Sequence, residues 1–279
     1  MARPAKLYQV EGTILARRDH AEADRILVVL TEQGRMDLLA KGVRKPRSRK
    51  AGHLELFSRA KLLVSRVQSS WDIISQAEAV AVREGLQEDF QRGTYARYIA
   101  ELVIRFVETE ADPAVFALVD DTLARLELDP DPELLARWYE QQLLSLAGFQ
   151  PEWRLCVGTR DDHSCRAPLQ PRATDRAGYG VDPEIGGALC PTCFAGIAQS
   201  GSARRLSPSA LSWLQALQQK ERDALTQYTL PAHTRRELAQ VMEHYIAYHL
   251  ERRPAALRLL ESTPYGFEAP LPIGPRIPR

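Results

Sequence analysis

Four cysteines in the second half of the chain have a spacing that can hold a metal ion. Cys190 and Cys193 form a C-x2-C pair, and Cys156 and Cys165 form an upstream pair with eight residues between them. Two such pairs in a Gly/Pro-rich segment favour a structural zinc site with four thiolate ligands and no open position for catalysis. Residues 152–205 have little apolar content, so we expect the metal to supply the folding energy of this segment.

The upstream cysteine pair leaves the ligand set open. Paired ligands of ribbon-type zinc sites usually have roughly two to four residues between them, whereas Cys156 and Cys165 are farther apart. His163 lies between the two cysteines and could replace Cys165 as a ligand. The alternatives to one structural Zn²⁺ per chain are a redox-active pair, free thiols and a lost metal site.

A second chemical signal lies in residues 41–50. Six of these ten residues are Lys or Arg, none is acidic, and Val43 is the only bulky apolar side chain. Six unpaired cations cannot be buried in a core, so the segment is either a solvated loop or a site for a polyanion. With cations from neighbouring strands, the predicted phosphate-contacting residues are Arg35, Lys41, Arg44, Lys45, Arg47, Arg49, Lys50, Arg59 and Lys61.

The net charge of +1 conceals a strong segregation of charge along the chain. Residues 1–66 carry 15 Lys or Arg against 7 Asp or Glu, whereas residues 67–155 carry 7 against 17. The remaining residues carry 15 against 12. This segregation indicates a polyanion-binding module joined to a module with another role.

Short strand patterns surround the basic segment. Apolar and β-branched residues between turn signals predict strands at residues 7–17, 25–31, 35–41, 56–67 and 71–80. Five short strands with a longer excursion after the third favour a small closed barrel, an OB-fold. Residues 41–50 occupy that excursion, so we expect residues 1–82 to form the polyanion-binding domain.

From about residue 84 the apolar spacing becomes helical. Helices are predicted over roughly residues 88–110, from Asp112-Pro113, from Asp131-Pro132 to Gly148, from Ser207-Pro208, and from a capping-box pattern at Thr234. The expected fold is therefore multidomain α+β. Its expected parts are an OB-fold at 1–82, a helical domain at 83–151 and 206–263, a zinc-ribbon-like insertion at 152–205, and an irregular Pro-rich tail at 264–279.

Signatures of enzymes and of membrane proteins are missing from the sequence. It contains no phosphate-binding G-x-x-x-x-G-K-[ST], no G-x-S-x-G and no H-E-x-x-H. We therefore expect no catalytic residues and no nucleotide cofactor. No apolar run reaches the roughly 18 residues of a membrane span, and the N-terminal residues lack a secretory apolar region, so we expect a cytoplasmic protein.

Short motifs spread over most of the chain carry a family resemblance. They are Gly12-Thr13-Ile14-Leu15, residues 22–26, 30–35 and 40–44, Ala77-Glu78, residues 139–144, 147–151 and 186–193, and Tyr248-His249-Leu250 before Arg252-Arg253-Pro254. In this order and spacing they resemble the RecO family of bacterial recombination-mediator proteins. The chain departs from the family at Cys156 and Cys165, because members with cysteines usually have a C-x2-C pair there.

The resemblance implies an OB-fold, a helical domain and a zinc-binding insertion. It also implies binding to single- and double-stranded DNA and annealing of complementary strands. Together with RecR, such a protein loads the recombinase RecA onto strands coated by the single-stranded DNA-binding protein, without hydrolysing ATP. The implied location is the bacterial cytoplasm, in association with the nucleoid.

The expected binding mechanism is electrostatic. If roughly six phosphates are contacted, the slope of log K against log salt should be about −4 to −5. OB-folds that hold single strands tightly stack bases on several aromatic rings, and the barrel region offers only Tyr8, Phe57 and Trp71. We therefore predict little sequence preference and modest discrimination against duplex.

Two other functions fit the same residues. One is an RNA-binding protein that combines an OB-fold with a zinc ribbon. The other is an interaction scaffold whose basic segment meets an acidic protein partner.

Overall fold

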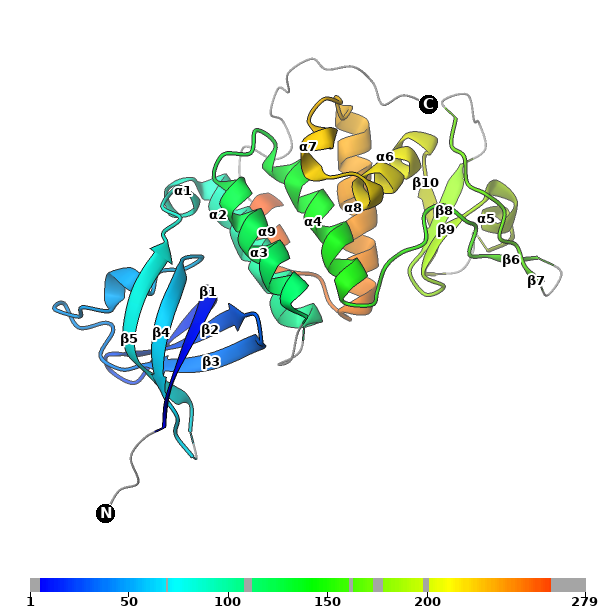
Figure 1. Cartoon of the computed structure of the whole chain (residues 1–279). Helices are drawn as coiled ribbons and strands as arrows, with labels where there is room; N and C mark the ends of the chain where they lie inside the picture. The colour runs from blue at the N-terminus through cyan, green and yellow to red at the C-terminus, as the bar shows by residue number, and fades with distance from the viewer. Residues whose placement is uncertain are drawn as a thin grey trace. The chain divides into compact units, whose positions relative to one another are not determined.

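The computed structural model describes residues 6–68, 70–107, 112–160, 163–172, 178–197 and 201–261 (Figure 1). The predicted Pro-rich tail at 264–279 lies outside these ranges. The chain divides into two compact units, Met1–Pro132 and Glu133–Arg279, and each is considered by itself. Among the described residues, no helix combines the length and the apolar character that a membrane span needs.

The first unit begins with a closed five-stranded barrel. Its strands are β1 (Leu7–His20), β2 (Asp24–Thr31), β3 (Gly34–Ala40), β4 (Arg59–Ser65) and β5 (Asp72–Ala81). They close in the order β1-β2-β3-β5-β4, with β3 parallel to β5 and the other pairs antiparallel. This is the topology of an OB-fold, so the predicted fold class is confirmed.

Alternating apolar side chains fill the interior of the barrel. Ile14, Leu27, Leu38 and Leu62, from four different strands, are each at most 1% exposed. The long connection between β3 and β4, which contains the short helix η1 (Ala51–His53), adds Val43 to this core. The only bulky apolar residue of the basic segment therefore holds that segment against the barrel.

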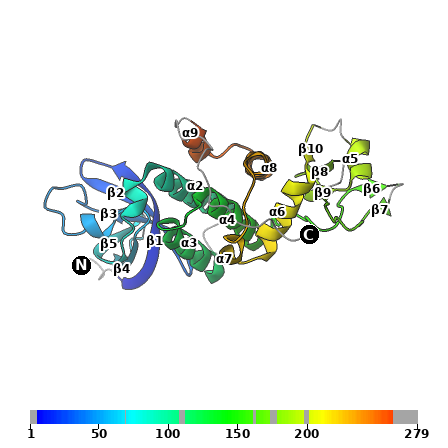
Figure 2. The ribbon, with the colours of Figure 1, turned by 90° about the horizontal axis from the view of Figure 1, so that it is seen from above.

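Helices complete the first unit. They are α1 (Gly85–Glu88), α2 (Phe90–Phe106) and α3 (Pro113–Leu126). Asp112 caps α3 through a bond from the Ala114 amide and Pro113 is the first helical residue, as predicted. Helices α2 and α3 lie beside β1 and β2 (Figure 2), so they cover one part of the outer surface of the barrel.

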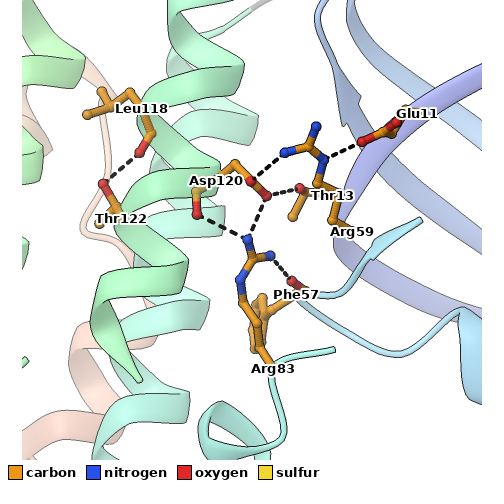
Figure 3. Close-up of polar contacts among 8 residues, drawn as sticks. All are labelled: Glu11, Thr13, Phe57, Arg59, Arg83, Leu118, Asp120 and Thr122. Atoms are coloured by element: carbon orange, nitrogen blue, oxygen red, sulfur yellow. Dashed lines mark hydrogen bonds and ion pairs between the residues drawn. The ribbon is translucent and has the colours of Figure 1, made fainter. Parts of the chain in front are cut away.

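A buried ionic network joins α3 to the barrel (Figure 3). The carboxylate of Asp120 accepts bonds from the Thr13 hydroxyl at 2.7 Å, from Arg83 at 2.6 Å and from Arg59 at 3.1 Å. Arg83 is 2% exposed, and it also donates to the Phe57 carbonyl at the end of the β3–β4 connection. One carboxylate on a helix thus fixes β1, β4 and the segment after β5.

The second unit contains a helical part. Its helices are α4 (Pro132–Leu146), α6 (Pro208–Gln219), α7 (Arg222–Leu225), α8 (Ala232–His249) and α9 (Ala255–Glu261). Gly148, just after α4, has a φ of +80°, in the left-handed region that glycine adopts readily at the end of a helix. Ser207 caps α6 by accepting a bond from the Ala210 amide, as predicted.

The predicted capping box at Thr234 is wrong. Helix α8 begins at Ala232, so Thr234 lies inside it, and its hydroxyl is 2.9 Å from that of Ser209. The side chain of Glu237 bonds to the amide and the hydroxyl of Ser207 instead. The carboxylate of Glu237, which the pattern assigned to the start of α8, therefore completes the N-terminal cap of α6. Spacing within one segment cannot reveal a partner in another helix.

Between α4 and α6 the chain forms a small insertion. It contains the hairpin β6 (Thr159–Arg160) and β7 (His163–Ser164), the sheet of β8 (Tyr179–Asp182), β9 (Gly187–Leu189) and β10 (Arg204–Leu206), and helix α5 (Pro191–Ile197). The insertion is drawn at the right of Figure 1. All four cysteines lie in this part of the chain.

Removing the carboxylate of Asp120 should destabilise the first unit strongly. The change Asp120→Ala leaves the buried guanidinium of Arg83 without its partner, and we expect a loss of about 3 kcal/mol. Chemical denaturation followed by circular dichroism measures this loss. The control is Asp121→Ala, because Asp121 forms an exposed pair with Arg125 and its loss should cost about 0.3–0.5 kcal/mol. Equal losses would contradict the role given to Asp120.

The same network predicts how stability depends on pH. Burial raises the pKa of Asp120, but the hydrogen bond and charge of Arg83, with help from Thr13 and Arg59, bring it below the ordinary value of 3.8. A carboxylate with a lowered pKa in the folded state stabilises the fold above its unfolded pKa. That stabilisation should be lost as the pH falls below about 4, and Asp120→Ala should show a smaller loss over this range.

Candidate nucleic-acid surface and metal centre

The basic excursion, residues 41–50, is attached to the turn between β1 and β2. The amide of Gly42 donates to the Asp24 carboxylate at 2.7 Å, and the amide of Arg44 donates to the Ala23 carbonyl at 2.9 Å. Gly42 has a φ of +64°, a conformation that favours glycine. Between these two bonds Val43 is 3% exposed, so the start of the excursion has a fixed position.

Successive turns carry the chain through the rest of the excursion. The amide of Lys45 donates to the Gly42 carbonyl, and the amide of Ser48 donates to the Lys45 carbonyl. The side chains of Lys41, Lys45, Arg47 and Arg49 are exposed, and within the described part of the chain none has a hydrogen-bond or ion-pair partner. An ordered backbone therefore presents four unneutralised cations to solvent.

Arg44 is exposed but partly neutralised. Its guanidinium lies 3.3 Å from the Asp19 carboxylate and donates weakly to the Glu22 carbonyl at 3.4 Å. Asp19 also accepts a bond from Arg25 at 3.0 Å, and this bond is the main reason that the pKa of Asp19 is lowered. Exposed ion pairs contribute little stability, so a phosphate can replace Asp19 as the partner of Arg44 at small cost.

Two predicted contact residues serve the fold. The ammonium of Lys50 donates to the Ile74 carbonyl of β5 at 2.8 Å, and burial lowers its pKa. The guanidinium of Arg35 donates to the Ile104 carbonyl in the last turn of α2 at 2.5 Å. A cation at this position interacts favourably with the C-terminal end of the helix dipole. Both side chains are partly buried in these roles.

Arg59 and Lys61 on β4 lie among acidic side chains. Arg59 donates to Glu11 at 2.6 Å and to Asp120 at 3.1 Å, and its guanidinium lies over the Phe116 ring. Lys61 stands opposite Glu11 on β1 and Glu78 on β5. Lys61 is exposed beside these carboxylates, and the other exposed members of the predicted set all belong to the basic excursion: Lys41, Arg44, Lys45, Arg47 and Arg49.

The four cysteines form one cluster. Their sulfur atoms all lie within 4.8 Å of one another, and Sγ of Cys165 is 3.9 Å from Sγ of Cys190. A tetrahedral zinc ion with Zn–S bonds of about 2.3 Å would place its sulfur ligands about 3.8 Å apart. The donor set and its spacing therefore fit a metal ion of this kind.

A hairpin explains the long spacing between Cys156 and Cys165. Strands β6 and β7 pair between the two cysteines and return the chain on itself. The Cys165 amide then donates to the Gly158 carbonyl at 2.9 Å, and the Arg166 amide donates to the Cys156 carbonyl at 3.2 Å. The eight intervening residues are thus an inserted hairpin, and the two sulfurs meet as they would across a shorter turn.

Backbone geometry around the cluster is tight. A Cβ on Gly158 would lie 2.7 Å from Cβ of Cys193, so only glycine fits there without displacing a cysteine. Among the described residues, the ligand group comprises the four cysteines and does not include His163. The geometry therefore favours Cys165 over His163 as the fourth ligand.

The packed thiols differ in acidity. Burial raises the pKa of Cys193, and its hydrogen bonds to the other three thiols raise it further, to about 12. Burial also raises the pKa of Cys190, but hydrogen bonds from the Cys193 amide and the neighbouring thiols outweigh it and lower this pKa to about 7. Four thiolates at this separation repel one another, so a bound cation would stabilise the fully ionised cluster.

Two features of these sites had no clear signal in the sequence. Arg160 on β6 lies 3.7 Å from the Cys190 sulfur, a contact that depends on the hairpin. At the end of β1, Arg18 and His20 meet Trp71, which precedes β5. The sequence marked Trp71 only as one of few aromatic residues, because its partners are far away along the chain.

Comparisons with known proteins agree with this architecture. The family model for the N-terminal domain of recombination protein O matches residues 5–83, and the model for its C-terminal domain matches residues 87–258. A DNA repair protein RecO from Roseiflexus sp. (strain RS-1) is 34% identical over 92% of this chain and 86% of its own length. RecO of Symbiobacterium thermophilum is 33% identical over 92% of this chain and 97% of its own length. RecO of Bifidobacterium adolescentis is 33% identical over 91% of this chain and 99% of its own length.

The different positions of two lysines predict different effects on stability. The change Lys50→Met removes the donor to the partly buried Ile74 carbonyl and should cost about 1–2 kcal/mol. The change Lys45→Met, in an exposed side chain, should leave the stability unchanged within about 0.5 kcal/mol. Denaturant titration of both variants measures the difference. If Lys50→Met were as stable as Lys45→Met, the structural role of Lys50 would be refuted.

Proposed function

Because the chain belongs to the RecO family of DNA repair proteins, we propose that it acts as a recombination mediator. In this proposal it binds single- and double-stranded DNA through phosphate contacts and anneals complementary strands. With RecR, it helps to load RecA onto DNA coated by the single-stranded DNA-binding protein. The observation that supports the proposal most is the set of exposed cations held on the ordered backbone of the basic excursion.

We also propose a division of labour along the chain. Residues 1–82 form the DNA-binding domain, residues 83–151 and 206–263 form a helical domain, and the insertion at 152–205 is stabilised by metal. The acidic middle of the sequence would keep DNA on the barrel by repulsion. The function requires no chemical step, because annealing and loading are binding events, and it would place the protein with the bacterial nucleoid.

The strength of the electrostatic term follows from the accessible cations. Lys50, Arg35 and Arg59 are held in the fold, and Lys61 stands opposite Glu11 and Glu78. The five exposed cations of the excursion remain, one of them partly paired with Asp19, so we expect four or five phosphate contacts instead of six. The slope of log K against log salt should then be about −3 for single strands and about −4 for duplex DNA. Cations that screen two phosphate chains at once allow complementary strands to approach, which is what annealing requires.

Reversing the charge of the basic excursion should abolish DNA binding. In the variant with Arg44→Glu, Lys45→Glu and Arg47→Glu, each phosphate contact that is lost should reduce the salt slope by about 1. Fluorescence anisotropy with labelled DNA, measured over a range of salt concentrations, gives both affinity and slope. The matched control reverses the exposed Arg205, Arg236 and Arg258 of the second unit, which changes the net charge equally and should retain binding.

Two outcomes would overturn this proposal. The first is DNA binding by the reversed excursion variant at wild-type affinity. The second is a clear preference for RNA over DNA oligonucleotides of the same sequence, which would instead support an RNA-binding protein. Strand annealing in the presence of the single-stranded DNA-binding protein completes the test, since neither an RNA binder nor a plain scaffold should promote it.

We propose that the cysteine cluster holds one structural Zn²⁺ per chain through Cys156, Cys165, Cys190 and Cys193. Elemental analysis of the purified protein should give about one zinc per chain. Cys190→Ser and Cys165→Ser should each lower this content, because each removes a thiolate ligand. The control is His163→Ala, which should retain the metal. Loss of zinc in His163→Ala and retention in Cys165→Ser would reverse the assignment of the fourth ligand.

A further inference from the structure

An aromatic and cationic cluster lies at one end of the barrel, outside the basic excursion. The Trp71 ring meets the His20 ring edge to face, with centroids 5.3 Å apart and an interplanar angle of 76°. The guanidinium of Arg18 lies 5.6 Å from the centroid of the Trp71 ring. Arg18 is exposed, and Trp71 and His20 are each partly exposed. A tryptophan at the surface of an OB-fold can stack on a nucleobase.

Strand register places this cluster on the outer face of the barrel. Arg18 pairs with Ile26, Ile26 with Leu39, and Leu39 with Ile73, so the row crosses β1, β2, β3 and β5. Leu27, which follows Ile26, and Leu38, which precedes Leu39, point into the core. Since side chains alternate along a strand, the row points away from the core; Arg18 is exposed and Ile73 partly exposed, whereas Ile26 and Leu39 are 2% and 6% exposed. His20 and Trp71 lie two residues beyond the two ends of the row and face the same way.

The backbone beside Trp71 is held in place. Asp72 accepts a bond from the Tyr8 hydroxyl at 2.7 Å and another from the Val67 amide at 2.8 Å. These bonds fix the start of β5, and therefore the position from which the indole projects. An aromatic ring that is already positioned loses little conformational entropy on binding a ligand.

The cluster adjoins the basic excursion through β1. Asp19 lies between Arg18 and His20, and its carboxylate pairs with Arg44 of the excursion. Arg18 and His20 contact Trp71 on the other face of the same strand end. The start of the excursion and the indole therefore both lie at the end of β1, on opposite faces of the strand.

We propose that Trp71, flanked by Arg18 and His20, is a stacking site for one unpaired base of single-stranded DNA. This inference rests on the proposed DNA-binding function and adds selectivity to it. A base inside a duplex already stacks on both of its faces, so only a single strand can use the indole. Arg18 leaves the ring as the base arrives, and it then becomes free to contact a phosphate.

The tryptophans of this chain allow a direct test. Trp138, Trp153 and Trp213 are 7%, 0% and 4% exposed and lie in the second unit, whereas Trp71 is partly exposed on the barrel. Oligothymidylate should quench the tryptophan fluorescence of the wild-type protein. The same titration of Trp71→Leu should show no such quenching, because the remaining indoles are buried.

Affinity measurements complete the experiment. Trp71→Leu should bind oligothymidylate about 5- to 150-fold more weakly than the wild type, and its affinity for a blunt duplex of the same length should not change. Trp71→Phe, which retains an aromatic ring, should recover much of the single-strand affinity. The unchanged affinity for duplex serves as the control for folding of the barrel.

The outcomes separate this inference from the proposed function. If the wild-type protein binds neither oligothymidylate nor duplex, the proposed function fails. If the wild type binds both and Trp71→Leu matches it, only the stacking site is refuted. Equal losses of single-strand and duplex affinity in Trp71→Leu would also refute it, since they would show that Trp71 supports the barrel and does not contact a base.

Discussion

The ion pair between Asp120 and Arg83 is the interaction on which the arrangement of the first unit depends. The side chain of Arg83 is 3% exposed and that of Asp120 is 16% exposed, so each charge needs the other to offset its lost hydration. The carboxylate also binds Thr13 of β1 and Arg59 of β4, and Arg83 reaches the Phe57 carbonyl. These bonds hold helix α3 on the barrel, and they also fix the end of the β3–β4 connection at Phe57 (Figure 3).

That arrangement decides which part of the barrel the helices cover. The row of Thr13, Leu30 and Arg35 crosses β1, β2 and β3 on the outer face, and its two polar ends bind α3 and α2. The row of Arg18, Ile26 and Leu39 crosses the same strands toward their other end. The helices cover the first row, and the basic excursion and Trp71 adjoin the second. The helices therefore cover one end of the barrel, and the exposed cations of the excursion lie at the other.

The sequence predicted what depends on local periodicity and missed what depends on distant partners. Strand alternation, turn residues and the long connection after the third strand were sufficient for the OB-fold, which the topology confirms. Charge counting located the basic excursion, but it could not separate Lys45 in solvent from Lys50, whose partner lies 24 residues away. Likewise, the pattern at Thr234 matched a capping box, whereas Glu237 bonds to Ser207 from 30 residues away. The C-x8-C spacing looked irregular because the pairing of β6 with β7 is not visible in a count of residues.

A mediator benefits from binding that is mainly electrostatic with a small stacking contribution. Annealing begins with two single strands and ends with a duplex, so a protein that held single strands through many stacked bases would oppose its own product. Phosphate contacts are nearly indifferent to strand pairing, and they weaken steeply with salt, which allows release. In the proposed mechanism, one aromatic ring beside a set of exposed cations would give an initial preference for single strands. That preference would end when the base pairs with its complement, and only phosphate contacts would then hold the paired strand.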